Sequence, residues 1–212
     1  MYDNTSRGGR IGPIEWATAG RPLPGEHVSG DQPIAIGIGD DAALFGVMDG
    51  LGHGAAAAAA AVRAVDALQN ARSQRVEVLV QLCHRALGGT RGVAMTLARV
   101  DFAAGTLTWT GVGNVTADLV AKAATGIQVR SSARLAAGIV GYRIPEIPPA
   151  QVIPIRAGDL IVVATDGIAE DHLQHIDFAA SATVIAKELL SRHAKGTDDA
   201  MVLTARHRGA TT

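Results

Sequence analysis

The stretch that decides the fold reads Met48-Asp49-Gly50-Leu51-Gly52-His53-Gly54. Asp49 stands at the end of an apolar run that begins at Ala42, and a glycine-rich turn follows it. The alanine-rich segment 54–70 comes next, and we expect it to be helical because alanine has the highest helix propensity. The stretch therefore predicts a strand that ends in a carboxylate, a tight turn and then a long helix.

Two later stretches repeat the pattern of an acid at the end of an apolar strand. In the segment 164–168, which reads ATDGI, Asp166 follows the apolar run 160–163. In the segment 196–203, which reads GTDDAMVL, Asp198 and Asp199 precede an apolar strand. Three such sites in one chain predict ligands for a hard metal ion that folding brings together.

Asp31 completes the set of candidate metal ligands, which are Asp31, Asp49, Asp166 and Asp198. Four carboxylates carry enough charge for two Mn²⁺ or Mg²⁺ ions, and two such ions can activate a bridging water as a nucleophile. The carbonyl of Gly50 can approach a metal closely because this residue has no side chain. Each acid also has a simpler interpretation: Asp-Gly is commonly a turn, Asp31 fits a solvated loop, and the pair 198–199 fits a strand cap, with Asp199 an alternative ligand to Asp198.

Composition limits the classes of protein that the chain can represent. The 212 residues are 48% apolar and 18% charged, which predicts a single domain over 1–212 with a sizeable core. The net charge of −1 and the absence of a basic block argue against nucleic-acid binding. The single cysteine, Cys83, cannot form an internal disulfide and fits the reducing cytoplasm. No apolar run is long enough to span a bilayer and the first residues are not a secretory signal, so we expect a cytoplasmic protein without a membrane partner.

The hydrophobic pattern predicts strands in runs and helices in pairs, which favours an α+β fold. We expect helices at 54–70, at 73–87 with Ser73 as the cap, and at 178–193. We expect strands at 14–18, 33–38, 42–48, 93–97, 106–110, 115–121, 127–130, 152–155, 160–165 and 200–205. Segments 21–30 and 144–149 are predicted loops, and Asp40 and Asp41 fit a turn.

The histidines and the remaining glycine-rich segments give weaker evidence about function than the acidic motifs do. His53 fits either a general acid or phosphate contact, or a plain polar surface residue. His172 and His175 have no matching ligand set and are predicted to be exposed, whereas Cys83 is predicted to lie in the core. The segment 37–42 has only the first two glycines of GxGxxG, and the segment 50–54 lacks the lysine of a phosphate-binding loop, so a nucleotide-dependent enzyme is a weak alternative.

Together, these motifs resemble the metal-dependent serine/threonine protein phosphatases of type 2C, and in particular their bacterial SpoIIE- and RsbX-like branch. The resemblance covers about 29–205. It includes Ser29-Gly30-Asp31, eighteen residues before Asp49, the segment 90–115 with its Val-Gly-Asn turn, and both late acidic motifs. The short chain, without a sensor or receiver domain, is most similar to the stressosome phosphatases of the RsbX type.

The resemblance implies a four-layer α/β/β/α sandwich of two mainly antiparallel sheets flanked by helices, with the metals at one edge. By position, Asp49 would bridge two ions and Gly50 would offer its carbonyl. Asp166 and Asp198 would complete one site, and Asp31 would belong to the other. The implied reaction is attack of metal-bound hydroxide on a phosphoserine or phosphothreonine. The implied partners are phosphorylated RsbS- and RsbR-like stressosome proteins, whose dephosphorylation resets stress signalling.

Two positions depart from the family pattern. Many type 2C enzymes have a histidine two residues after the bridging aspartate, where this chain has Leu51. A phosphate-binding arginine commonly precedes the first acid, and Arg21 is the nearest candidate here. The alternative function is a non-catalytic module on the same fold that binds a phosphorylated partner.

Overall fold

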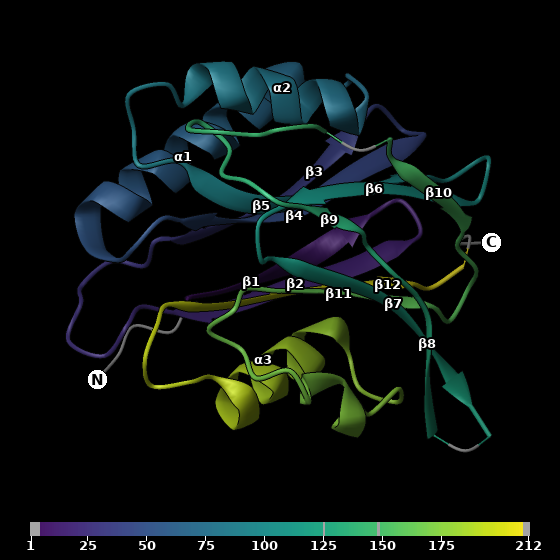
Figure 1. The fold of residues 1–212 in the computed structure, drawn as a ribbon. Helices are drawn as coiled ribbons and strands as arrows, with labels where there is room; N and C mark the ends of the chain where they lie inside the picture. The colour runs from purple at the N-terminus through teal and green to yellow at the C-terminus, as the bar shows by residue number, and fades with distance from the viewer. Residues whose placement is uncertain (1–4, 125, 148, 210–212) are drawn as a thin grey trace.

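Two β-sheets stack face to face, and helices cover the outer face of each sheet (Figure 1). The structure is a computed structural model that describes residues 5–124, 126–147 and 149–209. The layers follow in the order helix, sheet, sheet, helix, which confirms the predicted α+β sandwich.

Within the described residues, each sheet contains six strands. The first has the order β1 (Thr5–Ile11), β2 (Ile14–Arg21), β12 (Ala200–His207), β11 (Leu160–Ala164), β7 (Thr116–Ala123) and β8 (Gly126–Ser132). The second has the order β10 (Gln151–Pro154), β6 (Thr106–Val112), β5 (Val93–Asp101), β4 (Ala42–Gly50) and β3 (Asp31–Ile38), and β9 (Leu135–Ala136) pairs with β6. Neighbouring strands are antiparallel, except that β9 and β6 are parallel.

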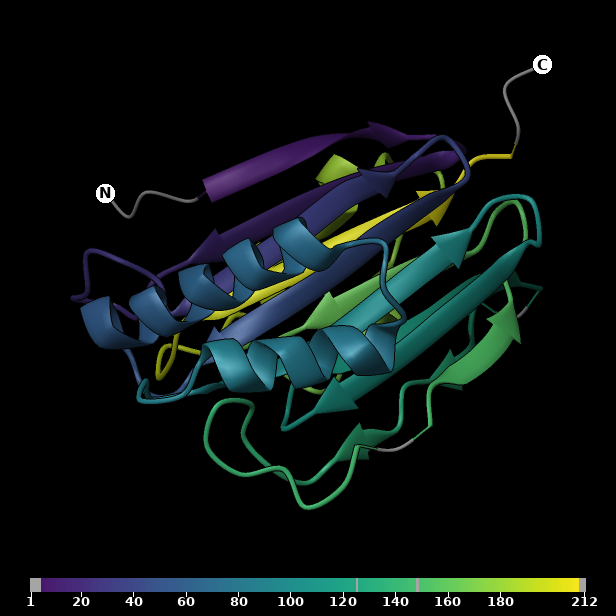
Figure 2. The ribbon, with the colours of Figure 1, turned by 90° about the horizontal axis from the view of Figure 1, so that it is seen from above.

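The helices pack on the sheets through small or aliphatic residues. Helices α1 (Gly54–Ala71) and α2 (Val76–Ala86) lie side by side over the second sheet (Figure 2). Helix α3 (Ala182–His193) and the 3₁₀ turn η1 (His172–His175) cover the first sheet. One face of α1 is mostly alanine, which lets this helix approach β4 closely. In the described part of the chain, no helix is long and apolar enough to cross a membrane.

Strand β4 shows how the sequence divides the core between the layers. Ala43, Phe45 and Val47 belong to the cluster between the two sheets, whereas Leu44 and Met48 belong to the cluster under α1 and α2. Both faces of β4 are buried because alternate residues of a strand point to opposite faces. Cys83 lies in the cluster under the helices, as predicted.

Two predicted helix starts are wrong. Helix α2 begins at Val76, and Ser73 does not cap it; the Ser73 carbonyl instead accepts a hydrogen bond of 3.1 Å from Arg99. Helix α3 begins at Ala182 rather than at residue 178, because Ser181 caps it by accepting the Val184 N–H at 3.3 Å.

The structure differs from the sequence prediction at two further places. Strand β1 was not predicted because its sequence, TSRGGRI, is mostly polar; it forms a strand by pairing with β2. The sequence predicts an exposed His172, but its side chain is buried beside α3. Its Nδ1 atom lies 2.7 Å from the Ala169 carbonyl oxygen. The side chain of His175 lies outside the described part of the structure.

Candidate metal centre

The candidate acids gather where strands of both sheets end. Strand pairing places Asp31 of β3 directly opposite Asp49 of β4. The Thr165 hydroxyl, at the end of β11, donates a 2.9 Å hydrogen bond to Asp31 Oδ2 and accepts the Met201 N–H at 3.0 Å. Asp31 therefore belongs to one sheet and is held by the other.

Two glycines allow the backbone segments around the acids to approach closely. A Cβ atom on Gly50 would lie 2.2 Å from the Ala57 carbonyl oxygen of α1, and one on Gly167 would lie 1.8 Å from the Asp199 carbonyl oxygen. Any side chain would separate these segments. The glycines thus hold the end of β4 against α1, and the Asp166–Gly167 turn against the start of β12.

The acids influence one another electrostatically. Burial raises the pKa of Asp49 to about 7, and the charges of Asp166 and Asp198 contribute to this rise. Burial, and then the charge of Asp49, raise the pKa of Asp31 well above its ordinary value. The pKa of Asp166 is also raised, first by burial and then by Asp198. Carboxylates that raise one another's pKa lie close together, and a bound cation would relieve their repulsion.

Asp198 and Asp199 have different surroundings, and sequence reasoning had left both open as ligands. The Asp199 carboxylate is buried and accepts the backbone N–H groups of Leu23 at 2.7 Å and Gly30 at 2.9 Å. Asp198 is half-buried, and its Oδ1 accepts the Asp199 N–H at 2.8 Å. Asp199 therefore anchors the loop 21–30, and Asp198 is the better placed of the two to bind a cation.

The donor chemistry of the site fits a hard cation. Asp31, Asp49, Asp166 and Asp198 offer carboxylate oxygens, and Gly50 offers a backbone carbonyl. Among the residues that the structure describes, no three carboxylate, imidazole or thiol side chains converge closely enough to form a complete metal cage. Mg²⁺ and Mn²⁺ prefer carboxylate, carbonyl and water oxygens, so this oxygen donor set suits them better than Zn²⁺, which takes Cys and His ligands readily.

Two polar neighbours of Asp166 were missed by sequence reasoning. The Asn114 side-chain amide donates to Asp166 Oδ2 at 2.6 Å, and Lys195 Nζ donates to the Asp166 carbonyl at 2.8 Å. Burial and Asp198 raise the pKa of Asp166, and both of these contacts partly oppose that rise. The Val-Gly-Asn turn was recognised as a motif, but nothing local indicates that its asparagine reaches an acid 52 residues away.

The two other residues considered for the site, Arg21 and His53, have partners that the sequence did not reveal. The Arg21 guanidinium donates to the backbone carbonyls of Pro22 and Lys195. His53 Nδ1 lies 2.6 Å from Glu26 Oε1, and its side chain is exposed. Arg21 therefore ties the loop after β2 to the segment before β12, while His53 is paired with an acid from that same loop.

Comparisons with known proteins agree with this fold. Residues 39–208 match the family model of Stage II sporulation protein E (SpoIIE). The phosphoserine phosphatase RsbX of Bacillus subtilis (strain 168) is 29% identical over 91 residues, which are 43% of this chain and 45% of RsbX. The matched region thus spans less than half of that curated relative.

Solved structures extend the similarity over nearly the whole chain. A chain from "The bacterial stressosome: a modular system that has been adapted to control secondary messenger signaling" has a TM-score of 0.81 and 29% identity, and the match covers 91% of this chain and 99% of the other. A structure of RsbX in complex with magnesium has a TM-score of 0.77 at 20% identity, covering 97% and 99%. Since the family model matches most of the chain, the protein belongs to the SpoIIE family and has the type 2C phosphatase fold.

Proposed function

We propose that this protein is a divalent-metal-dependent protein phosphatase that acts on phosphoserine and phosphothreonine. The observation that carries the proposal is the cluster of Asp31, Asp49, Asp166 and Asp198 at one end of the sandwich, where burial and the charges of neighbouring acids raise the pKa of the first three. Membership of the SpoIIE family supports it. We further propose that residues 1–212 act as one phosphatase domain.

The chain's own residues fit distinct roles around two ions. The charge of Asp49 raises the pKa of Asp31, and the charges of Asp166 and Asp198 raise that of Asp49, which suits a ligand shared by both ions. Thr165 orients Asp31. Bound Mn²⁺ or Mg²⁺ would polarise a water for attack on phosphorus and would neutralise charge on the phosphoryl oxygens.

The proposed substrates are phosphorylated RsbS- and RsbR-like stressosome proteins, whose dephosphorylation would reset a stress signal in the cytoplasm. The similarity to RsbX and to a chain from a stressosome structure supports this choice. Mixing the protein with such a phosphorylated scaffold protein and measuring phosphate release tests it separately from the general activity.

The general activity is tested by phosphate release from a phosphoserine protein in Mn²⁺, in Mg²⁺ and in chelator. We expect metal-dependent release, and Asp49→Asn should lower it by at least about a hundredfold, since even partners outside the ligand shell commonly cost 10–100-fold. Asp66→Asn, on the exposed face of α1, is the matched control and should keep full activity. Unchanged release in Asp49→Asn would contradict the proposal. Metal-independent binding of the phosphoprotein without release would favour the non-catalytic module.

A further inference from the structure

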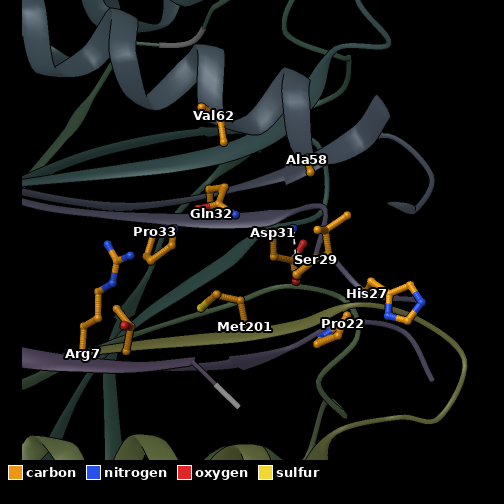
Figure 3. Close-up of a pocket in the computed structure, with 12 residues that line it drawn as sticks. Arg7, Pro22, His27, Ser29, Asp31, Gln32, Pro33, Ala58, Val62 and Met201 are labelled. Atoms are coloured by element: carbon orange, nitrogen blue, oxygen red, sulfur yellow. Dashed lines mark hydrogen bonds between the residues drawn. The ribbon is translucent and has the colours of Figure 1, made fainter. Parts of the chain in front are cut away.

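A groove runs along the open side of the sandwich and begins at the candidate metal centre. Its main part is a cavity of about 350 Å³ between β3, α1 and the strands β1 and β2, with Asp31 and Arg7 toward opposite ends (Figure 3). A second cavity of about 160 Å³ also contains Arg7, together with Thr18, Gln32 and Pro33, and continues the groove along β3. We call this continuous surface the Arg7 groove.

The walls of the Arg7 groove suit an extended polypeptide. Val62 of α1, Pro33 of β3 and Met201 of β12 supply apolar surface, and Val62 is 46% exposed. Gln32 and Thr18 supply hydrogen-bonding groups. β3 is an edge strand, but Pro33 has no N–H with which to extend the sheet, so side-chain contacts rather than an added strand would hold the occupant.

Arg7 gives the groove a positive charge away from the acids. Its side chain is exposed, and it forms no ion pair with the carboxylates of the described residues. Strand pairing places Arg7 opposite Thr18, and Thr18 opposite Leu203. Leu203 is two residues along β12 from Met201, which lines the same cavity as Asp31. β1 also lies two strands from β12, about 10 Å across the sheet, and two residues of strand span about 7 Å. The Arg7 backbone therefore lies about 12 Å from that of Met201, the length of three to four residues of an extended peptide.

We propose that the Arg7 groove binds the extended segment of the phosphorylated substrate protein that flanks the phosphoresidue, and that Arg7 pairs with an acidic side chain about three to four residues from it. The proposal rests on the proposed phosphatase function. A guanidinium group matches the geometry of a carboxylate, and the apolar wall accommodates the side chains between the two charges. Arg7 is thus a specificity residue, outside the acids that bind the metal.

The test uses two synthetic phosphoserine peptides that are identical except at the third and fourth residues on each side of phosphoserine, which are Glu in one peptide and Gln in the other. We expect the wild-type protein to have about a two- to fivefold lower KM for the Glu peptide, the size expected for one exposed ion pair. Arg7→Gln should abolish this preference without changing kcat, and Arg7→Glu should transfer it to a peptide with Lys. Turnover of p-nitrophenyl phosphate, which is too small to reach Arg7, should stay the same in both variants.

Arg10→Gln is the matched control, since Arg10 lies on the same strand, does not line the groove, and donates to the Gly12 carbonyl at 3.0 Å. It should keep the wild-type preference. Thermal melting checks that the variants fold. The wild-type preference should also shrink between about 50 and 500 mM salt, because screening weakens an exposed pair, and this measurement needs no variant.

Fluorescence anisotropy of labelled peptides separates the groove from the catalytic proposal. One outcome is that p-nitrophenyl phosphate is hydrolysed but the wild type and Arg7→Gln each bind and hydrolyse the two peptides equally well. The groove proposal is then overturned and the phosphatase function stands. If nothing is hydrolysed but Arg7 still selects the Glu peptide in binding, the groove is supported and the phosphatase function fails. A dimer that Arg7→Gln dissociates, without peptide preference, would show that a second copy occupies the groove and would overturn the proposal.

Discussion

Asp198 and Asp199 are neighbours in sequence, but the structure predicts opposite effects when each is changed to asparagine. The charge of Asp199 also raises the pKa of Asp31 and Asp49, but its carboxylate accepts the Leu23 and Gly30 N–H groups. Asp199→Asn weakens these two bonds and should lower the free energy of unfolding in chelator by about 1.5–3 kcal/mol, as for hydrogen bonds to a charged group. Asp198→Asn removes a charge that repels Asp49 and Asp166, so it should leave the metal-free protein at least as stable. Denaturant unfolding in chelator measures both.

Metal titration completes this comparison. Asp198→Asn should weaken Mn²⁺ binding in calorimetry by about tenfold or more, even though its fold is intact. Asp199→Asn should bind the ion nearly as well as the wild type at temperatures where it remains folded. The reverse result, with Asp199→Asn stable and unable to bind the ion, would make Asp199 the ligand.

At this scale the sequence points to the acids but not to their partners. An aspartate at the end of an apolar run is a local pattern, and it was visible for Asp49 and Asp166. Their environment depends on residues distant in the chain: Asn114 reaches Asp166, and Thr165 reaches Asp31 across 134 positions. Buried His172 was missed for the same reason, since its neighbour His193 arrives from α3. Pairings over such distances are set by the sheet topology rather than by local sequence.

The contact between β4 and α1 depends on one glycine. A Cβ on Gly50 would overlap the Ala57 carbonyl, so Gly50→Ala should push the start of α1 away from the strand. We expect the free energy of unfolding to fall by about 1–3 kcal/mol, the usual cost of overpacking. Gly196→Ala is the control: its Cβ would meet no atom within 4 Å, and we expect a change below about 0.5 kcal/mol. Equal stability of the two variants in denaturant unfolding would show that α1 does not press on Gly50.

Elements with a strong pattern of their own were predicted, and those that depend on neighbours were not. The helix at 54–70 and the strand at 42–48 correspond to α1 and β4 within two residues. Strand β1 has little apolar character and forms because all seven of its residues pair with β2. The apolar residues before Ser181 continue a helical pattern, but Phe178 packs against α3 from outside that helix.

At the scale of the whole molecule, the sandwich places one acid of the second sheet's edge strand and three acids of other strand ends at the same end of the molecule. The family resemblance predicted the sandwich itself, since the order of the motifs along the chain is specific even where each motif is weak. The same topology leaves the Arg7 groove open between the edges of the two sheets, formed partly by β1, so the groove could not be predicted without that strand.

The clustered acids should make the stability of the metal-free protein depend on pH. The folded-state pKa of Asp49 is about 7, and that of an unfolded aspartate is about 3.9. Between these values the folded protein holds a proton that the unfolded chain releases, so stability falls as pH rises through this window. Asp31 and Asp166 act in the same direction. In chelator, the melting temperature should therefore fall from about pH 5 to pH 8.

A bound cation should reverse this loss, because it binds the ionised acids of the folded state and not the unfolded chain. At about pH 8, millimolar Mg²⁺ or Mn²⁺ should raise the melting temperature well above its value in chelator, and at about pH 5 the same ion should have little effect because protonation competes with it. Asp49→Asn should flatten the pH dependence in chelator and reduce the shift caused by the metal. Differential scanning fluorimetry over this range measures all three effects. The opposite result would be a melting temperature in chelator that rises with pH by the same amount in the wild type and in Asp49→Asn. It would show that the acids do not repel one another and would remove the electrostatic basis for a cation at this end of the sandwich.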